Sequence, residues 1–162
     1  NRVAQSSLIT FNLENLYQTG QRVNLDLSQW LEDGLTLKEK DFRKKLTNYQ
    51  WHNYKNKFVA LYCSTDSILP AWAFLLVTTY LQPFAKKIIR GTLEDLEVQL
   101  FFQEIQNLDL SSFKDKSIII KGCSENIPED AYIQLITKLQ PIVKSLSYGE
   151  ACSSVPLYKK KK

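Results

Sequence analysis

Each of the three cysteines in this chain is followed directly by a serine. The pairs are Cys63-Ser64, Cys123-Ser124 and Cys152-Ser153. A thiolate binds soft metals such as zinc and iron, and it is also a strong nucleophile, so these residues are where chemistry is first expected. The pairs lie far apart along the chain, and none belongs to the compact Cys-x-x-Cys spacing that is typical of a metal site.

Two of the pairs fall at the same point of an internal repeat. The first copy begins at residue 54 and the second at residue 113. In the same order, both contain a Lys-x-Lys triplet, the Cys-Ser pair, a proline, an alanine, a threonine, the triplet Leu-Gln-Pro, a lysine and a glycine. The loop after Cys63 is two residues longer than the loop after Cys123. This shared order indicates the duplication of an ancestral unit.

Each copy is predicted to fold as strand, helix and strand. The runs 58–62 and 118–120 are continuously apolar, which is typical of parallel strands that are covered on both faces. Prolines stand where each helix is expected to begin and end, namely Pro70 and Pro83 in the first copy and Pro128 and Pro141 in the second. The returning strands are expected at 88–89 and 143–148.

A further helix is predicted between the copies, from about residue 92 to 107. Thr92 and Asp95 have the spacing of a capping pair at its start. The resulting order predicts an α/β fold: a mainly parallel sheet from a duplicated β-α-β unit, with right-handed crossovers and helices on both faces.

The N-terminal third is expected to add a β-hairpin and a helix to this sheet. The strands at 8–13 and 23–27 flank a turn at 18–20, and a charged helix is predicted at 38–50. The helix that includes residues 69–77 is apolar nearly all round and must be buried on every side. Either the N-terminal third or a second subunit is expected to cover it, so a homodimer is one prediction.

A single domain is expected over residues 1–162, because no low-complexity linker interrupts the chain. Its predicted parts are an N-terminal extension (1–53), the first repeat (54–91), a connecting helix (92–112), the second repeat (113–153) and a basic, solvated tail (154–162).

The parallel sheet predicts where the cysteines meet. Loops that leave the carboxyl ends of parallel strands emerge at one edge, so Cys63, Cys123 and Cys152 are expected to converge there. Three thiolates suit zinc, with a fourth ligand at tetrahedral geometry, or an iron-sulfur cluster. The candidates for the fourth ligand are Asp66, Glu125, Glu150 and the single histidine, His52, and Asp66 is the residue we select.

Two other interpretations of the cysteines stay open. In the first, the cysteines are structural, since free cysteine is often buried, and the protein is an interaction module whose apolar helix forms a dimer. Alternatively, Cys63 or Cys123 is a nucleophile in persulfide transfer or disulfide exchange, because each precedes a helix whose amino end stabilises a thiolate. The sequence identifies no reaction, and binding is favoured over turnover.

Composition excludes some partners. Of the 21 basic residues, four form the tail Lys159–Lys162, and the remaining 17 balance the 17 acidic residues. A neutral body argues against nucleic acid, and no apolar run is long enough for a membrane span. An odd number of cysteines without a secretory signal favours the reducing cytoplasm.

The chain resembles a bacterial family catalogued as domain of unknown function 2480 (DUF2480). The resemblance rests on the Cys-Ser pairs, the Leu-Gln-Pro triplets, residues 37–43 and the ending 155–159, and it covers nearly the whole chain. No activity is established for that family. Its members often sit beside iron-sulfur cluster assembly components, so the resemblance implies assembly proteins as partners and fits a cysteine-lined rim.

Overall fold

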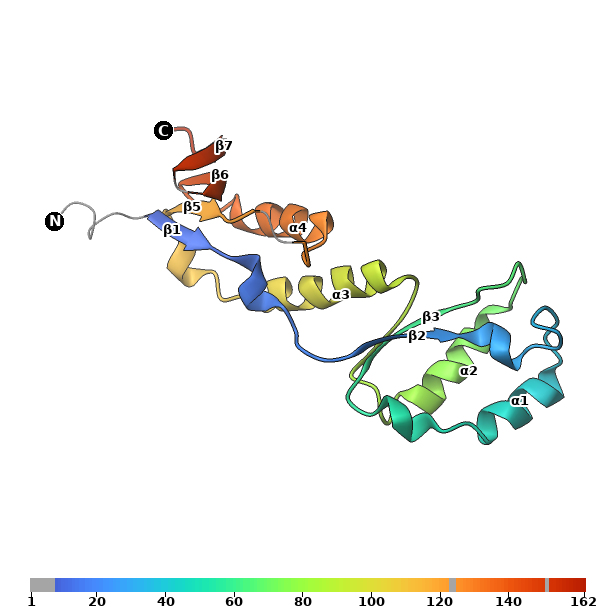
Figure 1. The fold of residues 1–162 in the computed structure, drawn as a ribbon. Coiled ribbons are helices and arrows are strands. Elements are labelled where there is room, and N and C mark those ends of the chain that lie inside the picture. Colours follow the sequence, from blue (N-terminus) through green and yellow to red (C-terminus); the bar gives the residue numbers. More distant parts are fainter. Residues whose placement is uncertain (1–7, 123–124, 151) are drawn as a thin grey trace. The chain divides into compact units, whose positions relative to one another are not determined.

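The computed structural model describes residues 8–122, 125–150 and 152–162 (Figure 1). The chain divides into two compact units. Unit 1 contains residues 1–18 and 97–162, and unit 2 contains residues 19–96. Each unit has its own β-sheet. Among the described residues, no helix has the length and apolar composition that crossing a membrane requires.

Unit 2 has a three-stranded, fully parallel sheet. Its strands are β2 (Arg22–Asp26), β3 (Phe58–Tyr62) and β4 (Lys87–Arg90), and they lie in that order. The α-helices are α1 (Glu39–Thr47) and α2 (Ala71–Leu81), and the 3-10 helices are η2 (Leu27–Trp30) and η3 (Trp51–Tyr54).

Both α-helices of unit 2 pack on the same face of this sheet. Val59 and Leu61 of β3 share one hydrophobic core with Phe42 of α1 and with Ala73 and Val77 of α2. Strands that follow one another in sequence order, with crossovers of one hand, place their connecting helices on a single side. Helices on both faces of one sheet were expected, and α1 and α2 both lie on this one face.

Unit 1 has a four-stranded sheet in the order β1, β5, β6, β7. The strands are β1 (Leu8–Phe11), β5 (Ser117–Ile120), β6 (Ser145–Glu150) and β7 (Ser153–Lys159), and only β7 runs antiparallel. The α-helices are α3 (Leu93–Gln106) and α4 (Glu129–Leu139), and the 3-10 helices are η1 (Leu13–Leu16) and η4 (Ser111–Phe113). The first turn of α3 belongs to unit 2. Phe101 of α3 and Leu135 of α4 pack with Ile118 and Ile120 in the core.

The α/β class and the mainly parallel pairing are confirmed, but the strands form two sheets and the predicted hairpin is wrong. β1 pairs in parallel with β5, and β2 pairs in parallel with β3. The connection from Phe11 to Arg22 includes η1, so it is longer than the two to five residues or so of a usual hairpin loop. Each N-terminal strand therefore joins the edge of a different sheet.

The C-terminal segment is a strand where a solvated tail was expected. β7 pairs with β6, and the N–H of Lys160 donates to the carbonyl of Lys144 at 2.8 Å. Pro156 concealed this strand in the sequence. A proline is tolerated here because β7 is an edge strand and the ladder is irregular beside Leu146 and Ser147.

The predicted helix boundaries are largely confirmed. At the start of α3, the Thr92 N–H donates to Asp95 Oδ2 at 2.8 Å, and the Asp95 N–H donates to Thr92 Oγ1 at 3.0 Å. This is the predicted capping pair. Pro70 and Pro128 stand one residue before their helices, in nearly identical extended conformations with φ −66°.

The two repeats also share a turn with unusual backbone geometry. Asn56 and Asp115 have φ values of 63° and 58°, in the left-handed region. Their N–H groups donate to corresponding carbonyls, of Phe84 at 3.0 Å and of Ile142 at 2.8 Å. The shared conformation agrees with duplication, while common ancestry stays a prediction.

The N-terminal third covers α2 in part. The rings of Phe42 and Trp72 meet edge to face, but Leu75 is 63% exposed. The predicted second subunit would cover Leu75. If it does, Leu75→Lys converts a dimer into a monomer in sedimentation experiments, because burying the ammonium group would cost several kcal/mol. A wild-type chain that sediments as a monomer contradicts this prediction.

We also expect Asn56→Ala to lower the free energy of unfolding by about 1 kcal/mol, since asparagine offsets the cost of a positive φ by local hydrogen bonds of its side chain and alanine cannot. Asn56→Gly should stay within about 0.5 kcal/mol of the wild type, because glycine adopts this conformation freely. Urea denaturation measures both. Equal losses in the two variants would assign the effect to other contacts of the asparagine side chain instead of the positive φ.

Candidate functional site

The carboxyl edge of the unit 2 sheet brings together polar residues from three strands. Asp26 and Arg90 are the last residues of β2 and β4, and Cys63 and Ser64 follow β3 directly. The register pairs Asp26 with Tyr62 and Arg90 with Leu61, so the strands end at nearly the same level. Ligands bind at this edge in parallel α/β sheets.

Cys63 and Arg90 line the same cavity, which has a volume of about 260 Å³. Its other lining residues are Leu61, Tyr62, Ser67, Leu69, Phe74 and Gly91. Cys63 is half-buried, and the Arg90 guanidinium carbon lies 3.9 Å from the centroid of the Phe74 ring. The cavity thus combines a thiol, a cation held over an aromatic face, and apolar walls.

A hydrogen-bond chain holds the thiol in place. Thr65 Oγ1 lies 3.3 Å from Cys63 Sγ and donates to the carbonyl of Gly34 at 2.5 Å. Since a hydroxyl has one proton, Thr65 must accept from the thiol while it donates to Gly34. Cys63 is therefore oriented through its S–H group.

The loop after Cys63 is tied to the turn that precedes α1. Ser67 Oγ donates to the carbonyl of Leu35 at 2.5 Å, next to the Thr65 contact with Gly34. These two bonds anchor the longer of the two Cys-Ser loops, which forms one wall of the cavity.

Asp26 joins the ends of β2 and β3. Its Oδ1 accepts from the N–H of Ser28 at 2.9 Å and from the N–H of Ser64 at 3.0 Å. Burial acts to raise the pKa of Asp26, but hydrogen bonds from Ser64 and Ser28 outweigh it and hold the pKa below the ordinary 3.8. The carboxylate fixes the backbone beside Cys63.

Two cysteines of the predicted rim, Cys63 and Cys152, follow strands of different sheets. Cys63 follows β3 in unit 2, whereas Cys152 is exposed in the turn between β6 and β7 of unit 1. Cys123 lies outside the described residues. The single sheet from which a common rim was derived is not present, so the topological reason for joining all three cysteines is lost.

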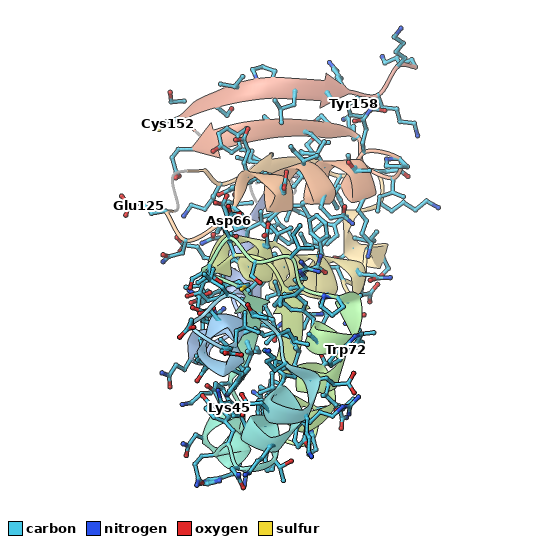
Figure 2. The ribbon with its side chains drawn as sticks, turned by 90° about the vertical axis from the view of Figure 1, so that its right-hand side faces the viewer. Lys45, Asp66, Trp72, Glu125, Cys152 and Tyr158 are labelled. Atoms are coloured by element: carbon cyan, nitrogen blue, oxygen red, sulfur yellow. The ribbon has the colours of Figure 1, made fainter. Side chains whose placement is uncertain are left out.

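The candidates for a fourth ligand are also distributed. Asp66 is exposed in the loop after Cys63, and exposed His52 lies in η3, before β3, at the opposite end of that strand. Glu125 and Glu150 are exposed in unit 1, and Figure 2 shows Glu125 on the same side of that unit as Cys152. Within the described ranges, no three His, Cys, Asp or Glu residues form a group that could hold a metal ion.

Asp26, Thr65 and Arg90 were not identified from the sequence. Asp26 and Arg90 follow the apolar stretches of their strands, in the same position that drew attention to Cys63. Polar residues at the carboxyl ends of predicted strands would therefore have included Asp26 and Arg90. Thr65 had no such signal, because its role depends on Gly34, which is distant in the sequence.

Unit 1 contains a larger hollow, of about 710 Å³, and none of the described residues that line it is a cysteine. Its walls are mainly apolar side chains from α4, from the residues just before it, and from the strands β5, β6 and β7. They are Ile120, Ile127, Tyr132, Ile133, Ile136, Tyr148 and Leu157, with Glu129 and Thr137. This hollow could accept an apolar group.

Comparison with known proteins places the chain in a family. It belongs to the family described as Protein of unknown function (DUF2480), whose model matches residues 1–160. No curated protein and no solved structure matches it. The resemblance drawn from the sequence motifs is confirmed, and the chemistry must be argued from the site itself.

We expect Asp26→Asn to lower the free energy of unfolding at neutral pH, because a charged acceptor makes the stronger hydrogen bonds. The lowered pKa means that the stabilisation is fully present above the unfolded pKa. This stabilisation is lost as the pH falls from the unfolded pKa of Asp26, about 3.8, through its lower pKa in the folded protein. Urea denaturation as a function of pH should show the two proteins converging in acid. A difference that is independent of pH would exclude a contribution from the charge.

Proposed function

We propose that Cys63 is a reactive thiol that acts on a small anionic substrate held by Arg90. The observation that supports this proposal is that both side chains line one cavity at the carboxyl edge of a parallel sheet. A guanidinium group binds carboxylate, sulfonate or phosphate oxygens through paired N–H donors. The apolar walls would exclude water from the reacting sulfur atoms.

The reaction class is sulfur transfer or disulfide exchange. After the thiol proton has left to solvent, the Cys63 sulfur attacks the outer sulfur of a persulfide, R–S–SH. The bond between the two substrate sulfurs breaks, R–S⁻ leaves, and Cys63 becomes the persulfide. In disulfide exchange, the same attack on R–S–S–R′ forms a mixed disulfide and releases R′–S⁻. Neither step requires an added oxidant or reductant, and both suit the reducing cytoplasm.

Two alkylating reagents of similar size test the role of Arg90. Iodoacetate is an anion and iodoacetamide is neutral, so we expect the ratio of their rates to be about tenfold higher at Cys63 than at exposed Cys152. Peptide mass spectrometry resolves the two sites within one sample. Cys152 is thus an internal control for reagent quality and ionic strength.

In Arg90→Gln, the preference of Cys63 for iodoacetate should disappear while the rate with iodoacetamide changes little. Arg22→Gln removes an equal charge near the opposite edge of the same sheet, and it should leave the preference intact. An unchanged ratio in Arg90→Gln would exclude anion binding by Arg90.

The second candidate function is metal binding. Zinc or an iron-sulfur species would be held by Cys63, Cys123 and Cys152. The protein would then be accessory to cluster assembly, with assembly proteins as its partners. One observation favours part of it. β5 and β6 are neighbouring parallel strands, so the chain leaves both at one edge, with Cys152 two residues after β6. Asp66 is the fourth ligand in this candidate.

Metal analysis of protein purified without oxygen tests this second candidate. A three-cysteine site predicts that Cys63→Ser and Cys152→Ser each lower the metal content to the same extent, since each removes one ligand. The visible spectrum distinguishes colourless zinc from a brown cluster. Metal that survives Cys63→Ser would exclude Cys63 as a ligand and leave its thiol for chemistry.

A further inference from the structure

Three neighbouring strands of unit 1 carry a lysine at the same edge of their sheet. Lys116 directly precedes β5, Lys144 directly precedes β6, and Lys160 directly follows the antiparallel β7. This edge is the one opposite to Cys152. Figure 2 shows Cys152 and Tyr158 at the two ends of β7, with the chain continuing beyond Tyr158 to its C-terminus.

Backbone hydrogen bonds align these lysines in a row. The Lys144 N–H donates to the carbonyl of Lys116 at 2.7 Å, and the Lys160 N–H donates to the carbonyl of Lys144 at 2.8 Å. Adjacent strands are about 4.8 Å apart, so the row is about 10 Å long. Each lysine lies two positions along its strand from a residue in or against the hydrophobic core. These residues are Ile118, Leu146 and Tyr158, for Lys116, Lys144 and Lys160 respectively. The alternation of strand side chains therefore places all three lysines on one face.

The lysine row, as we call Lys116, Lys144 and Lys160, has little neutralising charge. All three residues are exposed, and Asp115 lies 3.6 Å from the Lys160 ammonium group. Within residues 8–122, 125–150 and 152–162, no carboxylate forms an ion pair with Lys116 or Lys144. Four exposed lysines next to the row in the sequence add further positive charge: Lys114, Lys159, Lys161 and Lys162. Like charges on neighbouring strands repel, and an anionic partner would relieve that repulsion.

Exposed apolar side chains stand on β7, the strand that leads to Lys160. Val155 and Leu157 of β7 are 57% and 51% exposed, and Leu157 also borders the 710 Å³ hollow. A surface that joins cations to aliphatic side chains suits a protein segment that carries both carboxylates and apolar residues.

We propose that the lysine row binds an acidic segment of another protein, with Leu157 contacting apolar side chains of that segment. The size of the row supports a peptide over nucleic acid. A few carboxylates match three strands, whereas specific nucleic-acid interfaces bury about 1,000–2,500 Å² of protein surface. This surface is independent of the thiol chemistry of Cys63.

The same lysines have a possible structural role, which the experiment must separate from binding. Strands and their crossover helices run in opposite directions, so α4 ends near the edge where β5 and β6 begin. Cations stabilise the carboxyl end of a helix. In that case, removing the charges would lower the stability of the protein without changing its affinity for acidic peptides.

Fluorescence anisotropy with a fluorescein-labelled peptide tests the proposal. The probe is about ten residues long, the order of length of a single docking segment, with glutamates interspersed among leucines. We expect the triple variant Lys116→Gln, Lys144→Gln, Lys160→Gln to bind it about tenfold more weakly at low ionic strength. The matched control is Lys40→Gln, Lys44→Gln, Lys55→Gln, which removes the same charge from exposed positions of unit 2 and should change the affinity less than about twofold. Leu157→Gln should also weaken peptide binding.

Competition experiments decide the class of partner. A single-stranded oligonucleotide and vesicles that contain phosphatidylserine should displace the peptide less effectively than the unlabelled peptide does. Tighter binding to either competitor, equal losses in the two triple variants, or no peptide binding by the wild type would each overturn the proposal. A row variant with lower stability in urea and unchanged affinity would assign the lysines to the end of α4.

Discussion

Parallel strand pairing decides which side chains of this chain can meet. In each unit, the paired parallel strands end at a common edge, and every loop that leaves them emerges there. In unit 2, Cys63 and Arg90 line one small cavity at that edge, and Asp26 accepts from the N–H of Ser64 next to Cys63. In unit 1, the same rule places Cys152 at one edge and the lysine row at the other. The chemistry of the protein therefore depends on which sheet each strand joins.

Local interactions made much of the fold predictable from the sequence. The Thr92 and Asp95 pair specifies the start of α3 through contacts three residues apart, and the prolines delimit α2 and α4. Pairing partners were not predictable in this way. A strand such as β1 has the same alternating or apolar pattern whether it joins a hairpin or β5, because the choice depends on contacts with residues more than a hundred positions away. β7 was missed because Pro156 is unfavourable in most strands but tolerated at an edge.

In the candidate site, too, local sequence patterns were predictive and long-range pairings were not. Cys63 was placed correctly at the end of its strand, because a continuous apolar run followed by a polar pair is visible in the sequence. Its neighbours were not, since Arg90 lines the same cavity as Cys63 only because β4 pairs with β3. Thr65 acquires its role from Gly34, which the fold brings close. The thiol, the cation beside its cavity and the carbonyl of Gly34, which accepts from Thr65, thus come from three separate segments that only the folded sheet assembles.

A crystal structure of the protein after reaction with iodoacetate would test the central claim most directly. If the cavity is a site for anionic substrates, the carboxymethyl group on Cys63 will lie inside it, with its carboxylate within hydrogen-bond distance of the Arg90 guanidinium group. An adduct that points to solvent away from Arg90, or an unmodified Cys63 beside a modified Cys152, would contradict the account.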